Sequence, residues 1–263
     1  MNYIESSSTL RIASYNIWNP IFELRYNGQN TWKERLPHLI ENIILVNPDI
    51  LFMQEVGIES YNDLINDPEI SKIYTPLYFS HAPKSLETKI GRDGLALFYK
   101  EDKLKLNTIQ HSVVGSRPTH RRDVYGDFEM SLNENKIHFR VAGTHLEGES
   151  LDIGKMQILK LVEDVLNTAS LDRLDFVVVT GDFNEGDGGA NRPRAEIMEA
   201  HGFINDGSIS NTRNNLPTVV HKGHVDWIYA KIISTLPVKL KAVEPVGTEN
   251  SSDHKLIATD FLF

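Results

Sequence analysis

The stretch Phe176-Val-Val-Val-Thr-Gly-Asp-Phe-Asn184 contains the pattern that decides the fold. Its first part is a short run of apolar and β-branched residues, which is typical of a buried strand. Two side chains with oxygen ligands, Asp182 and Asn184, follow it. Because the ends of strands are where a scaffold gathers functional side chains, we expect a site at this edge of a sheet.

Similar short runs recur along the chain and predict further strands. They cover residues 10–16, 49–54, 95–99, 124–132, 136–144, 225–230 and 256–261. The turn-rich segment Asn133-Glu-Asn135 joins two of these runs as a hairpin. We therefore expect the three strands over residues 95–144 to form an antiparallel meander.

Two longer segments have helical periodicity. Thr31-Trp-Lys-Glu34 is a capping box, and apolar residues follow it at helical spacing, which predicts a helix that ends near Pro48. Residues 153–166 predict a second helix. We expect its apolar face to consist of Met156, Leu159, Val162, Val165 and Leu166.

Several strands, few helices and a hairpin connection favour an α/β protein of the α+β type, with two packed sheets and helices outside. The chain has 263 residues, of which 40% are hydrophobic and 24% charged, and it shows no repeat or low-complexity linker. We expect one domain over residues 1–263, with residues 1–8 as a disordered N-terminal tail.

The formal net charge of -9 provides no general attraction to nucleic acid or to anionic membranes, so local cations or a bound metal must meet a phosphate substrate. The chain has no cysteine, which excludes disulfides, thiolate nucleophiles and sulfur-ligated zinc. No apolar run is long enough to span a membrane, and the first residues do not form a signal segment. We therefore expect a cytoplasmic protein without a membrane anchor; no protein partner can be inferred.

Oxygen and imidazole side chains occur at the C-terminal ends of the apolar runs or just beyond them. They are Asn16, Glu55, His145, Asp182, Asn184, Asp226, Asp253 and His254. Carboxylate and amide oxygens are the ligands that Mg²⁺ and Mn²⁺ accept. A histidine oriented by an aspartate, with asparagine donors nearby, can activate water and hold charge on a phosphoryl group.

Each of these residues alone has a structural explanation. Asn16 could bond a turn, Asp182 and Asn184 could form an Asx turn, and Asp253 with His254 could cap the last strand. Taken together, they supply the ligand types that one reaction needs, so we interpret them as a metal-dependent site.

Six sequence blocks resemble the endonuclease/exonuclease/phosphatase (DNase I-like) superfamily in order and spacing. They are RIASYN from residue 11, DILFMQEV from 49, GTHLE from 143, VVTGDFNE from 178, HVDWIYA from 224 and SSDHKLI from 251. The resemblance spans nearly the whole chain. It implies a four-layer sandwich of two mixed β-sheets flanked by helices, with the active site at one rim.

The resemblance also implies roles for the residues. Glu55 would be the principal ligand of Mg²⁺ or Mn²⁺, with Asn16 and Asp253 near the metal or its waters. Asp182 would position or deprotonate the attacking water, and Asn184 would hydrogen-bond the scissile phosphate. His254, oriented by Asp226, would stabilise the phosphoryl charge or serve as acid/base, and His145 matches a second phosphate-binding histidine of the family.

Three further residues are candidates for substrate binding. Family members often supply an arginine near the position of Arg121 and Arg122, and a guanidinium suits a phosphate. Trp18, beside Asn16, could stack a base or a sugar. The abasic-site endonuclease branch carries an aspartate at the position of Trp18, so this chain departs from that branch.

The sequence favours hydrolysis of a phosphodiester in a nucleic acid or nucleotide. Asp93-Gly-Leu-Ala-Leu-Phe-Tyr99 is similar to the branch that holds poly(A) deadenylases, nocturnin-like enzymes and 2′-phosphodiesterases, and Thr144-His-Leu-Glu147 is similar to tyrosyl-DNA phosphodiesterases. The alternatives are a phosphatase or phospholipase C-type enzyme on a phosphoinositide or sphingomyelin, or a non-catalytic binding module.

Overall fold

The computed structural model describes residues 9–20, 30–80, 94–114, 121–148, 150–166, 171–185, 192–206, 225–248 and 250–263. The predicted tail over residues 1–8 lies outside the described residues. The strands are β1 (Thr9–Asn16), β2 (Ile50–Gln54), β3 (Thr75–Ser80), β4 (Gly94–Tyr99), β5 (Leu104–Val114), β6 (Arg121–Leu132), β7 (Asn135–His145), β8 (Phe176–Asp182), β9 (Asp226–Ile232), β10 (Lys239–Val246) and β11 (Leu256–Leu262). The helices are α1 (Trp32–Val46), α2 (Ile58–Asn66), α3 (Pro68–Ile73), α4 (Leu151–Leu166) and α5 (Pro193–Ala200), with a 3₁₀ turn, η3 (Leu171–Arg173).

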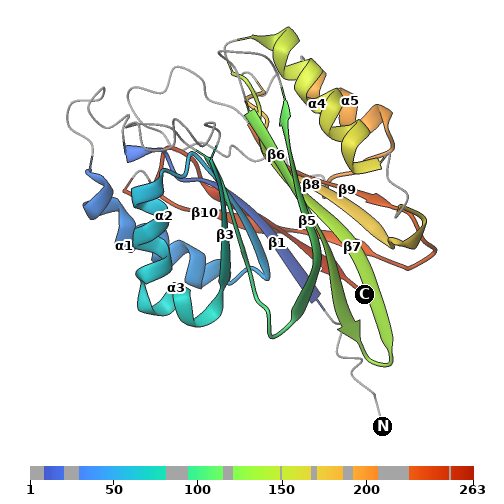
Figure 1. The fold of residues 1–263 in the computed structure, drawn as a ribbon, viewed down its shortest axis with the longest axis horizontal. Helices are drawn as coiled ribbons and strands as arrows, with labels where there is room; N and C mark the ends of the chain where they lie inside the picture. Colours follow the sequence, from blue (N-terminus) through green and yellow to red (C-terminus); the bar gives the residue numbers. More distant parts are fainter. Residues whose placement is uncertain are drawn as a thin grey trace.

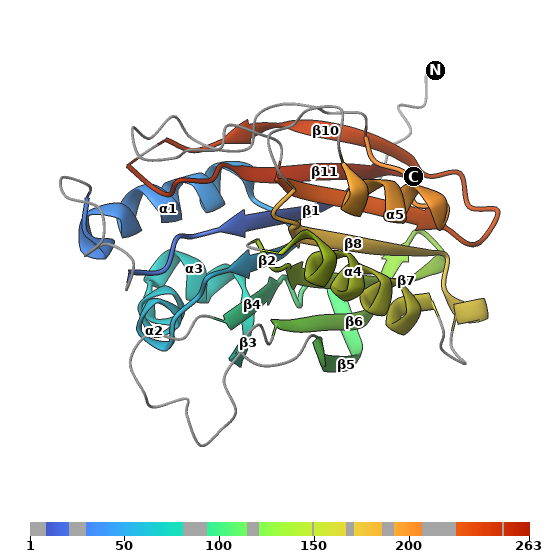
Figure 2. The same cartoon turned by 90° about the horizontal axis from the view of Figure 1, so that it is seen from above.

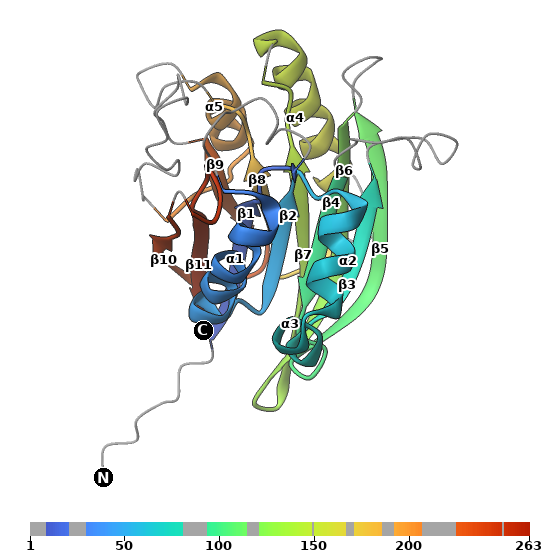
Figure 3. The same ribbon diagram turned by 90° about the vertical axis from the view of Figure 1, so that its left-hand side faces the viewer.

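These elements form four layers (Figures 1 and 2). A six-stranded sheet, sheet A, has the order β10-β11-β1-β2-β4-β3, and a five-stranded sheet, sheet B, has the order β5-β6-β7-β8-β9. Helices α1, α2 and α3 lie outside sheet A, and α4 and α5 lie outside sheet B, as the edge-on view in Figure 1 shows. Figure 3 looks onto the face of sheet A, with α1, α2 and α3 in front of it. The predicted four-layer sandwich of two mixed sheets is confirmed.

Among the described residues, three apolar layers hold the sandwich together. The central one lies between the sheets and includes Phe52, Phe128, Phe139 and Phe176. Gly143 belongs to this packing, because a Cβ there would lie 1.9 Å from the Phe52 ring. The glycine thus lets an aromatic side chain of one sheet lie directly against the backbone of the other.

The outer layers lie under the helices. Helix α1 buries Leu39, Ile40 and Ile43 against sheet A, and the Glu34 carboxylate accepts a 2.8 Å hydrogen bond from the Thr31 N–H, as the predicted capping box requires. The helix ends at Val46, close to the predicted end. No helix in the described part of the chain is long and apolar enough to cross a membrane.

The predicted apolar face of α4 is partly wrong. Met156 and Leu159 are 61% and 46% exposed, and the buried face instead includes Gly154 and Gln157. Gly154 faces the Arg194 guanidinium, where a Cβ would lie 2.3 Å from Nε, and Gln157 accepts a hydrogen bond from the Glu147 N–H. Polar contacts as well as hydrophobicity therefore determine which face of this helix is buried.

The predicted strands are present, but the predicted meander is wrong in one strand. Strands β6 and β7 pair as the expected antiparallel hairpin, and their neighbour in sheet B is β5. Strand β4 instead pairs with β2 and β3 in sheet A. The sequence did not indicate β3, β5, β10, α2, α3 or α5 as elements. Two of these unpredicted strands, β3 and β10, form the edges of sheet A, and both have mixed polar and apolar sequences.

Candidate active site

The site lies at one rim of the sandwich, where strands of both sheets end or begin. Asn16 ends β1, His145 ends β7 and Asp182 ends β8. Asp226, however, begins β9, and Asp253 and His254 precede β11, so the expectation that all ligands follow the C-terminal ends of strands is wrong for these three. They reach the same rim because β9 is antiparallel to β8, and β11 is antiparallel to β1.

The side chains of sheet B at this rim point into the gap between the sheets. In β7, β8 and β9, Val141, Val178 and Ile228 belong to the central apolar layer. Because side chains alternate along a strand, residues two or four positions away lie on the same face. His145, Asp182 and Asp226 therefore form a row on three neighbouring strands.

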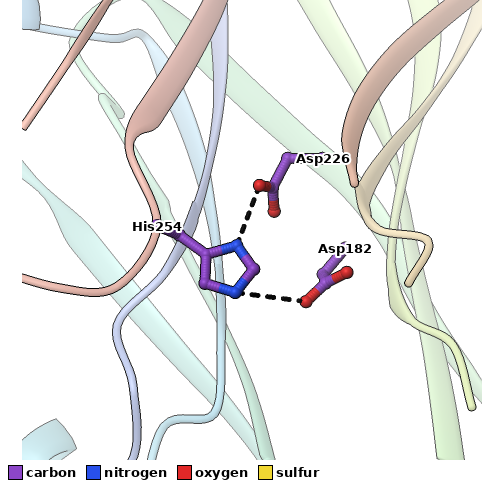
Figure 4. A group of neighbouring side chains, drawn as sticks. All are labelled: Asp182, Asp226 and His254. Atoms are coloured by element: carbon purple, nitrogen blue, oxygen red, sulfur yellow. Dashed lines mark hydrogen bonds and ion pairs between the residues drawn. The ribbon is translucent and has the colours of Figure 1, made fainter. Parts of the chain in front are cut away.

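His254 bridges two of these aspartates (Figure 4). Its Nδ1 lies 2.8 Å from Asp226 Oδ2, and its Nε2 lies 3.7 Å from Asp182 Oδ2. His145 approaches the same Asp182 oxygen, with Nε2 at 3.7 Å. One carboxylate oxygen thus faces two imidazoles that come from different sheets.

The surrounding carboxylates keep His254 protonated. Burial by itself would lower its pKa, but the charges of Asp226, Asp253 and Asp182, with the Asp226 hydrogen bond, outweigh burial and raise the pKa to about 10. An imidazole must be neutral to bind a metal. Although His254, Asp182 and Asp226 have ligand atoms within 4.8 Å of one another, the imidazolium is better suited to hold anionic oxygen than to bind a cation.

Asn16 connects the two sheets at the centre of the site. Its Nδ2 donates to Glu55 Oε1 at 2.9 Å and to Asp182 Oδ2 at 3.0 Å, and its Oδ1 accepts from the Trp18 N–H at 3.0 Å. Ser252 donates from its hydroxyl to the Asn16 carbonyl at 2.7 Å. The amide therefore holds two carboxylates close together, despite their mutual repulsion.

Glu55 has the contacts expected of a cation ligand. Its two oxygens accept from the Asn16 amide at 2.9 Å and from the Asn19 N–H at 3.1 Å. A carboxylate can accept about four hydrogen bonds, so these two contacts do not by themselves saturate its oxygens. Glu55, Asp182 and Asp253 together offer hard oxygen ligands of the kind that Mg²⁺ and Mn²⁺ accept, so the residues fit such an ion.

The backbone is strained at two positions of the site. Trp18 and Glu55 have φ values of 54° and 59°. This left-handed region costs such residues about 1–2 kcal/mol, whereas Asn184, with φ of 49°, adopts it readily. Strain of this kind persists only where the surrounding structure enforces it, and here it turns the Trp18 and Glu55 side chains at the rim.

The loop that follows β8 is fixed by Gly181 and Arg194. A Cβ on Gly181, which has φ of 145°, would lie 2.0 Å from the Thr144 carbonyl oxygen, so only glycine lets β7 and β8 approach here. Arg194, which is 2% exposed, donates to the carbonyls of Phe183, Asn184 and Glu147. Asn184 donates from Nδ2 to the Leu146 carbonyl at 2.8 Å.

The sequence did not reveal this role of Arg194, because a single arginine near a loop most often lies at the surface. The sequence contains only an indirect indication of this role, in Glu185, the last residue of the VVTGDFNE block. The Glu185 carboxylate accepts hydrogen bonds from the backbone N–H groups of Arg194 and Ala195 at 3.1 and 2.9 Å. The glutamate thus caps the N-terminal end of α5 and positions Arg194 against the loop that follows β8.

Trp18 does not offer its ring to solvent. It is 5% exposed, and the Arg35 guanidinium lies 4.9 Å from its ring centroid. Arg35 also donates to the carbonyls of Ile17, Trp18 and Ser251. The pair therefore fixes the loop after β1 against the segment that precedes His254, and the structure places Trp18 in support of the site, not on its surface.

Arg121 and Arg122 begin β6, next to the end of β7. Val124 lies in the central apolar layer, so alternation places Arg122 on the inner face with His145 and places Arg121 on the opposite face. Arg122 Nη1 lies 3.1 Å from His111 Nδ1. Of the two predicted arginines, Arg122 is the one on the side of the site.

Comparison with known proteins shows the family of the chain. A sequence model of the endonuclease/exonuclease/phosphatase family matches residues 13–254. The chain belongs to the endonuclease/exonuclease/phosphatase family. Members of this family are phosphoester hydrolases that depend on divalent metals, so the predicted enzyme class is confirmed.

Among curated family relatives, the chain is 25% identical over 236 residues to a protein of Vairimorpha ceranae named "Probable CCR4-Not complex 3'-5'-exoribonuclease subunit Ccr4". The match covers 79% of this chain and 47% of the relative. A second protein of the same name, from Encephalitozoon cuniculi, is 24% identical over 67% of this chain and 40% of its own length. The chain thus spans about half the length of the curated relatives it matches.

Solved structures of this family share the fold. The human nocturnin catalytic domain with bound sulfate superimposes with a TM-score of 0.72 at 19% identity, over 98% of each chain. A mannosyl-6-phosphatase of Bacteroides thetaiotaomicron gives a TM-score of 0.75 at 17% identity, over 97% of this chain and 100% of that one. At these identities the likeness shows the architecture, and it confirms the predicted DNase I-like fold.

Proposed function

We propose that this protein hydrolyses a phosphodiester bond in a nucleic acid or nucleotide, with Mg²⁺ or Mn²⁺ held by Glu55. Asp253 and Asn16 would lie beside the ion or its waters. The metal supplies positive charge for the phosphoryl oxygens and lowers the pKa of bound water. The remaining roles belong to side chains of the chain.

The observation that carries the proposal is the environment of Asp182. Its Oδ2 faces the Asn16 amide at 3.0 Å and the Nε2 atoms of His145 and His254, each at 3.7 Å. Its Oδ1 accepts from the Asn184 N–H at 2.7 Å. A carboxylate fixed on several sides can orient a water molecule and accept its proton.

The two histidines would hold the phosphate. The imidazolium of His254 and the N–H of His145 point to the same small region from opposite sheets, where charge develops on the phosphoryl oxygens. Asp226 orients His254 through the 2.8 Å contact at Nδ1. Asn184 would donate its second amide N–H to the same phosphate; its first N–H donates to the Leu146 carbonyl, next to His145.

Similarity to named nucleases supports a nucleic acid or nucleotide as the substrate. The curated relatives are named as exoribonuclease subunits, and one solved neighbour is described as a zebrafish protein complexed with single-strand DNA product. A substrate of this type also suits the rim, where cationic and imidazole side chains follow one another along the sheet edge.

The test is hydrolysis of single-stranded RNA and DNA oligonucleotides, a 2′,3′-cyclic nucleotide, a sugar phosphate, sphingomyelin and an inositol polyphosphate. Each would be incubated with Mg²⁺, with Mn²⁺ and with chelator, using the wild type, Asp182→Asn and, as control, the exposed Asp172→Asn. We expect metal-dependent cleavage of a nucleotide phosphodiester that Asp182→Asn abolishes and Asp172→Asn keeps. Cleavage of only the sugar phosphate or a lipid would overturn the substrate class, and metal-independent cleavage would overturn the site.

A further inference from the structure

The rim of the active site continues beyond His145 to the edge formed by β6, β5 and β3. Arg122 of β6 contacts His111 of β5, with 3.1 Å between Nη1 and Nδ1. The His111 ring lies 5.8 Å from the Phe79 ring of β3, centroid to centroid, at an interplanar angle of 57°. These three side chains, which we name the β5 edge cluster, join the two sheets at their outer strands.

All three side chains lie on the inner faces of the sheets, as the catalytic candidates do. His111 is paired with Val124, a residue of the central apolar layer, and Arg122 is two positions from Val124 on the same strand. Phe79 packs against the same layer from sheet A. The β5 edge cluster and the Asp182 site therefore lie along one gap between the sheets.

The spacing along this gap separates the cluster from the reacting phosphate. Arg122 is on β6 and Asp182 on β8, and neighbouring strands are about 4.8 Å apart, so their backbones are roughly 10 Å apart. The Arg122 contact with His111 is directed toward β5, away from Asp182. Arg122 is thus placed to meet a part of the substrate next to the scissile phosphate.

The chemistry of the cluster suits a planar ring beside an anion. Phe79 is half-buried and His111 is exposed, so part of each ring remains accessible. Aromatic rings bind nucleobases by stacking, and a guanidinium adds charge and planar contact. In a chain with a net charge of -9, a local cation beside two rings is a distinctive surface for a polyanion with bases.

We propose that the β5 edge cluster is a binding subsite for the nucleotide next to the scissile phosphate, with the base against Phe79 and His111 and its phosphate near Arg122. This inference rests on the proposed function, because it takes Asp182 as the reacting centre. It narrows the substrate to a strand of at least two nucleotides.

The experiment measures binding separately from hydrolysis. Isothermal titration on Asp182→Asn protein with Mg²⁺ would compare an RNA trinucleotide with two analogues that lack the base at the first or the last position. Phe79→Leu and His111→Asn would be added to this protein. The matched controls are Phe263→Leu, half-buried at the C-terminal end of the same apolar layer, and the partly exposed His138→Asn.

We expect one abasic analogue to bind about tenfold or more weakly than the complete trinucleotide, since base stacking contributes at this scale. Phe79→Leu and His111→Asn should bring this ratio toward one, and both controls should keep it. Arg122→Met should weaken all three ligands and reduce the slope of log affinity against log salt by about one. Melting temperatures would verify that each variant is folded.

Equal base dependence in the cluster variants and the controls would overturn the subsite. If the wild type cleaves oligonucleotides but the Asp182→Asn protein binds them without base dependence, the subsite fails and the proposed function stands. If the trinucleotide binds with the expected dependence but the wild type cleaves no phosphodiester, the proposed catalytic function fails and the subsite stands.

Discussion

At the end of sheet A where β1 and β2 begin, carboxylates are paired with lysine and arginine. Asp49 accepts from Lys100 at 3.2 Å and from Lys103 at 2.6 Å, and Asp260 binds the Arg11 guanidinium at 2.7 Å. At the opposite end, where β1 and β2 finish, Glu55 and Asp182 are held by the Asn16 amide, and Asp182 also faces two histidines. The first arrangement neutralises charge, whereas the second keeps negative charge available for a cation.

The backbone shows the same contrast. Away from the site, the non-glycine residues with left-handed φ in the described part of the chain are Asn47 at the end of α1 and Asn133 in the β6–β7 hairpin, and asparagine adopts this conformation readily. At the site they include Trp18 and Glu55, for which the conformation is unfavourable. The end of the molecule that carries the candidate site is therefore built at some expense of stability, as is common where function requires a fixed geometry.

The largest expected effect follows from removing charge at the site. Glu55→Gln should lower kcat/KM for the phosphodiester by at least about a hundredfold, because it removes the charge proposed to hold the cation. The same change should leave the free energy of unfolding unchanged or raise it, since it relieves repulsion with Asp182. Steady-state kinetics and urea unfolding would measure both. A variant that is fully active, or one that is strongly destabilised, would contradict the contrast between the two ends.

A second test concerns Asp123, a carboxyl near the site that the sequence did not indicate. It is fully buried on the outer face of β6, and its Oδ1 accepts from the Thr144 hydroxyl at 2.6 Å. Burial raises the pKa of Asp123 to about 7 from its ordinary value of 3.8, despite the Thr144 hydrogen bond. Between these values, the folded protein holds a proton that the unfolded chain has released.

Stability should therefore fall as the pH rises from about 4 to about 7, and it should level off above. One pKa unit corresponds to about 1.4 kcal/mol, so a shift of about three units means that the free energy of unfolding of wild type should fall by about 4 kcal/mol relative to that of Asp123→Asn between pH 4 and pH 9. Urea unfolding across this range would measure the difference, with the exposed Asp172→Asn as control. If the difference in free energy of unfolding between wild type and Asp123→Asn were the same at every pH, the buried carboxyl would not titrate as described.

Arg194→Lys should lower kcat with a smaller effect on KM. Lysine keeps the positive charge but cannot reach the carbonyls of Phe183, Asn184 and Glu147 together, so the loop that carries Asn184 should shift. A displacement of about 1 Å can reduce turnover by up to about a hundredfold, and we expect ten- to hundredfold. Arg192→Lys, a partly exposed neighbour, is the control, and equal effects of the two changes would argue against a positioning role.

The smallest expected effect is at the opposite end of sheet A. Asp49→Asn should lower the free energy of unfolding by about 1–2 kcal/mol, because it removes the partner of two lysines and weakens the hydrogen bond to the Arg11 N–H. Its activity should stay within about twofold of wild type. Loss of activity in this variant would mean that the two ends are not independent.

The sequence was sufficient for the parts of the site that local patterns determine. The apolar run before Asp182 and the block around His254 predicted both the strands and the residues at their ends, and the structure brings these residues together. It was insufficient where a contact joins distant segments. Trp18 was taken for a stacking surface because its partner, Arg35, lies on α1 and contacts it only in the folded chain.

The direction of the strands was a further limit. Asp226 was placed after an apolar run, although it begins one, because the sequence does not indicate that β9 runs antiparallel to β8. Edge strands such as β3 and β10 have weak patterns, since hydrogen bonding to β4 and β11 defines them more than hydrophobic alternation does.

Isothermal titration calorimetry with Mn²⁺ on the wild type, Glu55→Gln and Asp49→Asn tests most directly whether a cation binds at the rim where β1 and β2 end. The account predicts that wild type and Asp49→Asn bind the ion with the same affinity, and that Glu55→Gln binds it at least about tenfold more weakly. Equal binding by Glu55→Gln, or loss of binding in Asp49→Asn, would contradict it.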